Sequence, residues 1–360
     1  MTVARGGALR AHLETWRPYT LAYPGVVGLA GAAAGGGTAT AGALLAAWAA
    51  PTLGWLGGHY LGDYFDRDLD AIGKPQRPIP SRRLSPGTAR ACGIGAVLAA
   101  AVVTVLVNWP VVIAVFVALA GVIAYSLVLK GRGILGNAVR GVLTAIAVLF
   151  GAAVTVGVGD PPSWRALPVA IVFLLHDTAS NLVGTLRDVR GDRAGGYRTL
   201  PVRRGLPFAI RTASALHLSA LLVAAAGTAF TDHPTVYLVL LVITASAGVP
   251  AFVPLLRSGA APTARLALRS HEVLVGERLV LAGAVLAGGW GPVAGLAVLL
   301  PLLAISLVTQ RRMRARHEFP PEAPGALSRR QGAVAPARGT ALPRPRPGPH
   351  RTGREEEVAP

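Results

Sequence analysis

Cysteine and charged side chains are scarce in this sequence. The single cysteine, Cys92, excludes an intramolecular disulfide and any metal cluster built on cysteine ligands, and its apolar surroundings are typical of a buried thiol. Only 14% of the 360 residues are charged, against roughly a quarter in a soluble protein. Acidic residues are the rarest of these, with 17 Asp and Glu against 35 Lys and Arg. The composition argues against an ordinary soluble protein. Because acidic residues are so rare, a cluster of them indicates a functional site.

Long apolar runs take the place of the missing charge. Hydrophobic residues make up 52% of the chain, and the mean hydropathy is +0.51. The runs are about 18 to 25 residues long, the length that an α-helix needs to cross a bilayer. We therefore predict an all-α polytopic protein of the cell membrane, with a bundle of nine or ten transmembrane helices and a central cavity open to the cytoplasm. The predicted spans are 19–35, 42–62, 88–107, 111–129, 135–158, 167–185, 206–230, 235–256, 273–289 and 293–308.

Basic residues alternate between the predicted loops. The loops after the second, fourth, sixth and eighth spans are rich in Lys and Arg, whereas the others carry almost none, with Arg165 as the exception. Loops with excess positive charge face the cytoplasm, so residues 1–17 and the basic loops are predicted to lie there. This bias explains much of the net charge of +18, and we expect no nucleic-acid partner. The transmembrane domain is expected at 18–310, followed by a basic tail, 311–360, whose Pro, Gly and Arg content predicts disorder.

Four aspartates follow the second predicted span within eight residues, 63–70. Asp63, Asp66 and Asp70 are spaced i, i+3 and i+7, which places them on one face of a helix. Three like charges on one face repel one another unless a cation lies between them. A hard divalent cation, which prefers oxygen ligands, fits this face. Asp68 lies off the face and is expected to pair with nearby arginines.

A second set of polar side chains lies at the end of the sixth predicted span. Asp177, Asn181, Asp188 and Asp192 follow one another at helical spacings of 4, 7 and 4, again on one face. Ionisable residues within a span are costly and usually face a cavity. The sequence thus contains two acidic helix ends on the same predicted side of the membrane, each followed by an arginine-rich loop.

Together the two acidic helix ends favour a site for Mg²⁺ and a diphosphate. Mg²⁺ in proteins commonly bridges a few carboxylates to phosphate oxygens. The neighbouring Lys and Arg side chains are suited to the remaining phosphate oxygens. Because the surroundings are lipid-like, the organic part of the ligand is expected to be long and apolar.

These residues resemble known motifs of the UbiA-type intramembrane prenyltransferases. Residues 62–81, GDYFDRDLDAIGKPQRPIPS, resemble the first motif, N-D-x-x-D-x-x-x-D followed by R-P-I-P-S. Residues 188–202, DVRGDRAGGYRTLPV, resemble the second, D-x-x-x-D followed by G-x-x-T-L-P. Tyr125-Ser126, Lys130 and Gly136-Asn137 are similar to an intervening Y-S, K, G-N segment. The resemblance covers roughly residues 15–290.

The resemblance implies Mg²⁺-dependent transfer of a prenyl group from an isoprenyl diphosphate to a lipophilic acceptor, either an aromatic quinone precursor or a hydroxyl lipid. It assigns one Mg²⁺ to Asp63, Asp66 and Asp70 and another to Asp188 and Asp192, and these five form the predicted catalytic and metal site. Substrate contacts are implied for Lys130, Arg77, Arg198, Tyr125, Asn181 and Asp177. The first three of these would neutralise the diphosphate, Tyr125 would orient diphosphate or acceptor, and the last two would bind the acceptor.

One residue departs from the family pattern, and two other functions remain open. Gly62 stands where the family usually has Asn, so one ligand or hydrogen bond at the metal site is missing. A membrane terpene cyclase would use the same metal–diphosphate site without a second substrate. A cation-coupled transporter would use the intramembrane acids as cation sites.

Overall fold

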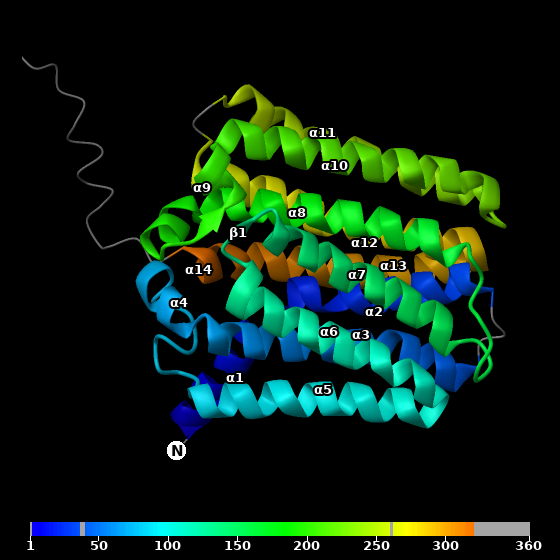
Figure 1. Cartoon of the computed structure of the whole chain (residues 1–360), viewed down its shortest axis with the longest axis horizontal. Coiled ribbons are helices and arrows are strands. Elements are labelled where there is room, and N and C mark those ends of the chain that lie inside the picture. The colour runs from blue at the N-terminus through cyan, green and yellow to red at the C-terminus, as the bar shows by residue number, and fades with distance from the viewer. Residues whose placement is uncertain (1, 37–39, 260–261, 320–360) are drawn as a thin grey trace, which may run out of the picture. The chain divides into compact units, whose positions relative to one another are not determined.

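Each predicted span falls on helix in the computed structural model, which describes residues 2–36, 40–259 and 262–319; only 155–158, at the end of the fifth span, lie beyond their helix. The long helices lie side by side (Figure 1). The elements are α1 (Thr2–Trp16), α2 (Pro18–Gly35), α3 (Ala41–Phe65), α4 (Arg67–Gly73), α5 (Pro86–Asn108), η1 (Trp109–Val111), α6 (Val112–Ala124), η2 (Tyr125–Leu129), β1 (Arg132–Gly133), α7 (Leu135–Val154), α8 (Ala166–Ala194), β2 (Arg198–Thr199), α9 (Leu200–Arg204), α10 (Leu206–Gly227), η3 (Thr228–Phe230), α11 (Pro234–Arg257), α12 (Ala264–Trp290), α13 (Pro292–Thr309), η4 (Gln310–Arg314) and α14 (Ala315–Glu318).

The apolar helices have the length and composition of membrane spans. Seven helical stretches of the described residues are long and apolar enough to cross a bilayer, and one of them, Pro86–Leu129, contains two predicted spans. The predicted spans within α2 and α3 are not among the seven, since Gly, Ala and polar residues dilute their apolar content. Large apolar side chains such as Leu106 and Val293 are 80% and 83% exposed. Such apolar outer faces suit lipid contact.

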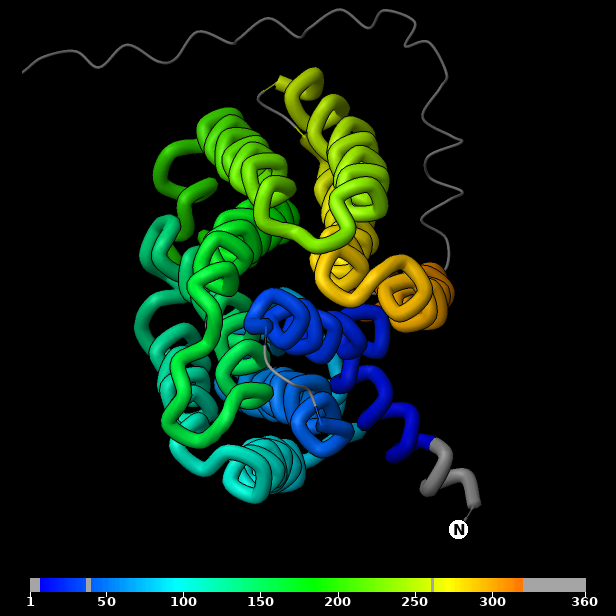
Figure 2. Tube along the Cα trace, turned by 90° about the vertical axis from the view of Figure 1, so that its right-hand side faces the viewer, coloured from blue at the N-terminus to red at the C-terminus, as the bar shows by residue number. Residues whose placement is uncertain are grey.

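Helix α2 occupies the centre of the packing. It contacts α3, α7, α8, α12 and α13, and the view along the helices in Figure 2 places it among them. Its approach to α7 depends on glycine: a Cβ at Gly31 would overlap the backbone of Val148, and one at Gly151 would overlap the backbone of Gly28. Small residues let helix backbones approach in lipid, as the Gly- and Ala-rich sequence predicts.

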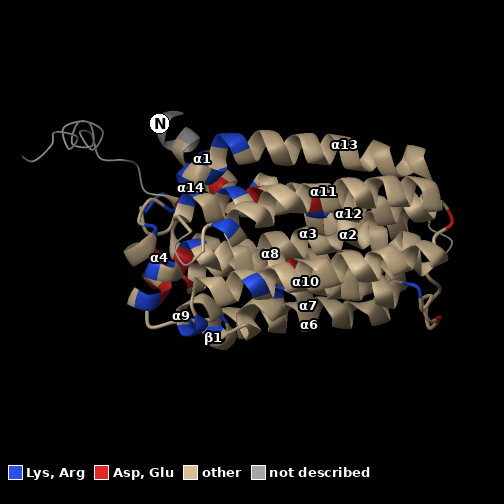
Figure 3. Ribbon diagram, turned by 90° about the horizontal axis from the view of Figure 1, so that it is seen from above, with Lys and Arg blue, Asp and Glu red and all other residues tan. Residues whose placement is uncertain are grey.

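The two ends of the bundle differ in charge. The short elements α1, α4, α9, α14 and β1 lie at one end, where most Lys and Arg side chains gather (Figure 3). At the opposite end, the exposed ring of Trp164 packs on Phe230 at 5.0 Å between centroids, and Trp109 is 64% exposed. Exposed Trp side chains at helix ends are typical of a membrane–water interface.

The last helix extends beyond the expected end of the membrane domain. From α13 the chain continues helically through η4 and α14 as far as Glu318, with Arg314 and His317 buried. The predicted tail begins at 311, so its first residues are helical and packed. The rest of the predicted disordered tail, 320–360, lies outside the described residues.

Candidate active site

The first acidic motif lies at the junction of α3 and α4. The spacing of the aspartates predicts a single helix, but α3 ends at Phe65 and Asp66 links it to α4. Backbone bonds from Asp66 N to Gly62 O and from Asp70 N to Asp66 O keep the path nearly helical. Asp63 and Asp70 are each only 5% exposed. The Asp68 side chain is 88% exposed and pairs with Arg67, so it points away from the other three as predicted.

Each of the three inward aspartates has a basic partner, two of them from distant parts of the chain. Arg17 binds Asp63 Oδ1. Lys130 Nζ lies 2.6 Å from Asp66 Oδ2. Arg77 Nη1 contacts both oxygens of Asp70 at 3.0 and 2.8 Å. Three basic side chains therefore balance the charges of the three aspartates. A metal ion bound by the aspartates and an anion bound by the basic side chains could take the place of these pairs.

The basic partners Lys130 and Arg77 remain charged despite their burial. Burial alone would lower the pKa of the Lys130 ammonium, but the Asp66 carboxylate raises it above its ordinary value. Burial likewise opposes the charge on Arg77, and the carboxylates of Asp70 and Glu318 raise its pKa well above the ordinary value. Both side chains are therefore cationic at physiological pH and available to bind phosphate oxygens.

The second acidic motif occupies the last turns of α8. The Asp188 carboxylate accepts from the Arg187 guanidinium at 3.2 and 3.0 Å, and Lys74 Nζ lies 3.1 Å from its Oδ1. Asp192 is buried and accepts from Thr199 Oγ1 at 3.2 Å. Because Lys74 follows α4 directly, its contact with Asp188 joins the second motif to the first.

Glu318 of α14 joins the two motifs at a second point. Its Oε2 lies 2.9 Å from Lys74 Nζ, 3.3 Å from Arg187 Nη2 and 3.6 Å from Arg77 Nη2. Three cations from two motifs thus share one carboxylate oxygen. Neither the role of Glu318, which lies in the predicted tail, nor the contact of Arg17 with Asp63 is predicted from the sequence. No short-range pattern signals either contact, since the partners are far apart in the chain.

The deeper polar residues of α8 are paired within the bundle. Asp177 accepts from Tyr23 Oη at 3.1 Å and from Thr144 Oγ1, and Arg278 Nη1 lies 3.7 Å away. Asn181 accepts from Asn137 Nδ2 at 2.9 Å. Asp177 lies eleven residues from Asp188, about 16 Å along a helix. These residues therefore form a separate polar layer below the charged end.

The remaining predicted contact residues lie around the charged end. Tyr125 begins η2 and is half-buried, with the Arg140 guanidinium 5.9 Å from its ring centroid. Arg198 is exposed on β2, which pairs in parallel with β1. This strand pair ties the loop carrying Lys130 to the loop after the second motif. Arg198 is thus near the site in the chain, but the structure does not bring its side chain into the charge pairs described above.

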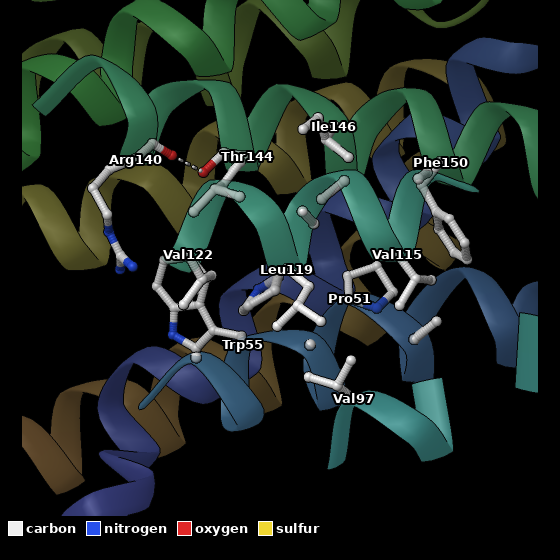
Figure 4. Close-up of a pocket in the computed structure, with 18 of the residues that line it drawn as sticks. Pro51, Trp55, Val97, Val115, Leu119, Val122, Arg140, Thr144, Ile146 and Phe150 are labelled. Atoms are coloured by element: carbon white, nitrogen blue, oxygen red, sulfur yellow. Dashed lines mark hydrogen bonds between the residues drawn. The ribbon is translucent and has the colours of Figure 1, made fainter. Parts of the chain in front are cut away.

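An apolar pocket lies between helices beneath the first motif (Figure 4). It contains about 840 Å³ of empty space, including its open mouth, and residues of α2, α3, α5, α6 and α7 line it. Arg140 lies at one end, stacked on Trp55 at 4.3 Å, and Phe150 lies toward the other. Gly58 and Leu61 of α3 line the pocket, and Asp63 follows two residues later. An apolar chain in this pocket would have one end beside the acidic junction.

The two acidic motifs offer the donor set of a hard cation. The candidate ligands are carboxylate oxygens throughout, which suits Mg²⁺. One buried oxygen, Asp63 Oδ2, has no hydrogen-bond partner among the described residues. An orphaned buried carboxylate oxygen is costly unless a cation or water takes it up. The side chains present therefore fit Mg²⁺.

A helical bundle with this charged end and adjoining apolar pocket defines a polytopic membrane enzyme. The chain belongs to the UbiA prenyltransferase family, whose sequence model matches residues 21–273. The family resemblance inferred from the motifs is thereby confirmed, and the enzyme class is prenyltransferase.

Known relatives agree in sequence and in fold. The digeranylgeranylglyceryl phosphate synthase of Natronomonas pharaonis is 34% identical over 197 residues, which are 54% of this chain and 69% of that protein. A UbiA homolog from Aeropyrum pernix K1 superposes with a TM-score of 0.62 at 16% identity, covering 75% of this chain and 96% of that one. A UbiA homolog from Archaeoglobus fulgidus bound to DMAPP and Mg²⁺ superposes with a TM-score of 0.53 at 14% identity, covering 84% of this chain and 98% of that one.

Proposed function

We propose that this protein transfers a prenyl group from an isoprenyl diphosphate to a lipophilic acceptor within the membrane, with Mg²⁺ as cofactor. The observation that carries the proposal is the joining of two acidic motifs through Lys74 and Glu318, next to the end of α3 whose Gly58 and Leu61 line an apolar pocket. The related fold from Archaeoglobus fulgidus, bound to DMAPP and Mg²⁺, supports the choice of ligand and ion.

The aspartates and the basic residues would take different parts of the ligand. Asp63, Asp66 and Asp70 would hold one Mg²⁺, and Asp188 and Asp192 another. Bound there, Mg²⁺ would supply positive charge that stabilises the leaving diphosphate. The basic residues released from their present pairs would bind the remaining oxygens, where charge grows as the allylic C–O bond breaks. These are Lys74, Arg77, Lys130 and Arg187.

The apolar pocket would hold the prenyl tail and exclude water. The pocket extends along α7 from Arg140 to Phe150, ten residues or about 15 Å. Exclusion of water protects the electron-poor allylic carbon until the acceptor attacks. The acceptor's nucleophilic oxygen or carbon then forms the new bond, and the diphosphate leaves with the bonding pair.

We propose a hydroxyl-bearing lipid as the acceptor, in preference to an aromatic quinone precursor. Support comes from the relative of Natronomonas pharaonis, which is named for the synthesis of digeranylgeranylglyceryl phosphate. An acceptor hydroxyl requires a proton acceptor as it attacks. The carboxylates of the charged end are suited to that role.

We also propose ten crossings, with the charged end in the cytoplasm of the cell. The described long helices α2, α3, α5, α6, α7, α8, α10, α11, α12 and α13 would each cross once. An even number returns the chain to its starting side, in agreement with the position of α1 and α14 at one end (Figure 3). The gathering of Lys and Arg at that end supports the cytoplasmic assignment.

The test is an assay of membranes carrying the protein. Labelled geranylgeranyl or farnesyl diphosphate is supplied with Mg²⁺ and with hydroxyl-lipid or aromatic acceptors, and products are separated by chromatography. We expect transfer of label to a hydroxyl lipid, abolished by EDTA. A cyclic hydrocarbon formed without an acceptor would instead identify a terpene cyclase, and absence of turnover with every acceptor would contradict the proposal.

Replacing Gly62 by Asn should strengthen Mg²⁺ binding. A Cβ at Gly62 meets no atom within 4 Å, so the site where the family usually has Asn has room for that side chain. The added amide oxygen is expected to lower the Mg²⁺ concentration for half-maximal activity about tenfold, the effect of one good hydrogen bond or ligand. Gly42→Asn at the far end of α3, which also has open space, is the matched control. An unchanged Mg²⁺ dependence in Gly62→Asn would contradict the placement of the ion.

Filling the apolar pocket should select against long prenyl chains. Leu119 lines the pocket, whereas Val117 on the same helix is 51% exposed. Leu119→Trp is expected to lower kcat/KM for geranylgeranyl diphosphate about tenfold or more while dimethylallyl diphosphate is affected little, because overpacking displaces the tail. Val117→Trp should change neither value. Equal losses for both substrates would show that the tail lies elsewhere.

A further inference from the structure

A second cluster of potential metal ligands lies inside the bundle, away from the acidic motifs. His176 of α8, His217 of α10 and Glu277 of α12 are 0%, 5% and 2% exposed. His176 Nε2 lies 3.5 Å from Glu277 Oε2, and His217 Nε2 lies 3.4 Å from Glu277 Oε1. One ligand atom from each residue can be chosen so that all lie within 4.8 Å of one another.

The polar atoms of this cluster lack hydrogen bonds among the described residues. Both ring nitrogens of each histidine and both Glu277 oxygens are buried, and none has a hydrogen bond among the described residues. Buried polar atoms left without a hydrogen bond destabilise the fold unless another ligand satisfies them. Each nitrogen–oxygen separation is longer than a usual hydrogen bond. Each is close to the roughly 3.3 Å between two neighbouring ligands of a tetrahedral ion with bonds near 2.0 Å.

The surroundings of the cluster also suit a metal site. Asp177 Oδ1 lies 3.6 Å from His176 Nδ1, so a carboxylate faces the second ring nitrogen, as one does in many metal-bound histidines. Gly248 of α11 makes room for the ring of His217, since a Cβ at position 248 would lie 2.6 Å from His217 Nε2. The Phe252 ring packs on His217 at 4.9 Å between centroids and shields the site.

We propose that His176, His217 and Glu277 bind a Zn²⁺ ion that ties α8, α10 and α12 together. Two imidazoles and one carboxylate form a known zinc ligand set with one position left for water, whereas Mg²⁺ prefers oxygen ligands. The site is distinct from the aspartates of the charged end. It also fixes the ring next to Asp177, and so the polar layer that includes Tyr23 and Thr144.

Metal analysis of the purified protein tests the proposal. The wild-type chain in detergent is loaded with Zn²⁺, freed of excess metal and analysed by plasma mass spectrometry. We expect about one equivalent of zinc in the wild type and loss of most of it in His217→Ala and Glu277→Gln. His59→Ala, which removes another buried histidine, should retain it.

A spectroscopic measurement on the intact wild type covers the case in which a variant does not fold. Titration with Co²⁺ should produce the visible absorption of a low-coordinate site, saturating near one equivalent, and Zn²⁺ should abolish it. Bound Zn²⁺ should also raise the Tm of the wild type, since a ligand that binds only the folded state stabilises it. No retained zinc and no cobalt absorption in the wild type, or equal zinc in all variants, would overturn the proposal.

A different observation carries a second inference, which rests on the proposed diphosphate site. Glu318 Oε2 lies where three cations converge, as a phosphate oxygen would. The segment that carries it is fixed in place: Gln76 Nε2 donates to His317 O at 3.0 Å, and Arg17 Nε donates to His317 Nε2 at 3.1 Å. Arg314, 2% exposed, lies 2.7 Å from His271 Nδ1.

We infer that Glu318 competes with the diphosphate of the substrate for the same three cations. The carboxylate contacts Lys74, Arg77 and Arg187 from one position, as a phosphate oxygen would. A bound diphosphate would repel it and displace the end of α14. The apparent affinity for diphosphate is then reduced by the fraction of chains in which Glu318 is seated.

Binding of inorganic diphosphate without Mg²⁺ tests this inference apart from prenyl transfer. Calorimetry on the purified chain should give about tenfold tighter binding for Glu318→Gln than for the wild type. A tenfold effect corresponds to Glu318 contacting the three cations in about nine of ten molecules. Glu14→Gln, which removes a carboxylate paired with Arg10 and Arg83, should bind as the wild type does. Equal or weaker binding by Glu318→Gln would overturn the inference. Failure of the proposed prenyl transfer would appear only in the product assay.

Discussion

Asp63→Asn and Asp188→Asn should each lower the rate of Mg²⁺-dependent prenyl transfer at least about 10²-fold, the loss expected when one preorganised electrostatic contact to the leaving group is removed. Each change keeps the shape of the side chain but removes a charged ligand oxygen. The two residues come from separate motifs. Both variants are therefore expected to lose a similar part of the rate only if both motifs serve one reaction. The measurement is initial rate with labelled geranylgeranyl diphosphate at saturating Mg²⁺.

Asp68→Asn is the matched control for these variants. It lies in the same acidic run but is 88% exposed and pairs only with its neighbour Arg67 among the contacts described. Its rate should stay within about twofold of the wild type, as for a surface substitution. Because Asp63→Asn also leaves Arg17 without its charged partner, gel filtration in detergent must show a monodisperse protein. Full activity in either Asp63→Asn or Asp188→Asn would mean that its motif takes no part in catalysis.

Lys130→Gln should raise KM for the prenyl diphosphate about tenfold to a hundredfold, the worth of one hydrogen bond to a charged group. Lys130 Nζ lies 2.6 Å from Asp66 Oδ2, and the Lys130 side chain is 20% exposed. It therefore lies at the edge of the acidic junction. With Mg²⁺ on Asp66, the ammonium would be free for a phosphate oxygen. Steady-state kinetics with varied prenyl diphosphate measure the effect.

Arg132→Gln controls for the general loss of positive charge near this loop. Arg132 lies two residues after Lys130 on β1 and is exposed. Its KM should match the wild type at physiological salt, where exposed charges are screened. An equal rise in both variants would indicate long-range attraction of the substrate in place of direct contact by Lys130.

The membrane helices and the acidic motifs could be predicted because both depend on short-range patterns. Apolar runs of span length become helices in lipid, where the backbone must satisfy its own hydrogen bonds. Helical spacing also predicted that Asp68 would point away from Asp63 and Asp70. The break at Asp66 was missed because a motif with regular spacing continues through it.

The contacts between distant parts of the chain could not be predicted. Arg17 adopts a left-handed backbone conformation, φ 49°, between α1 and α2, and its partner Asp63 is 46 residues away. Glu318 follows Lys74 by 244 residues. The zinc ligands proposed for α8, α10 and α12 are single residues on three helices, and no local spacing relates them. Such sites arise from packing, which a single sequence does not encode in a readable pattern.

Binding of a non-transferable analogue, geranylgeranyl thiolodiphosphate, tests most directly whether the two acidic motifs form one site. Calorimetry with Mg²⁺ is carried out on the wild type, Asp63→Asn, Asp188→Asn and the double variant. One shared site predicts that the double variant binds about as weakly as the weaker single variant, since either change already breaks the site. Losses that multiply in the double variant, as for independent sites, would contradict the account.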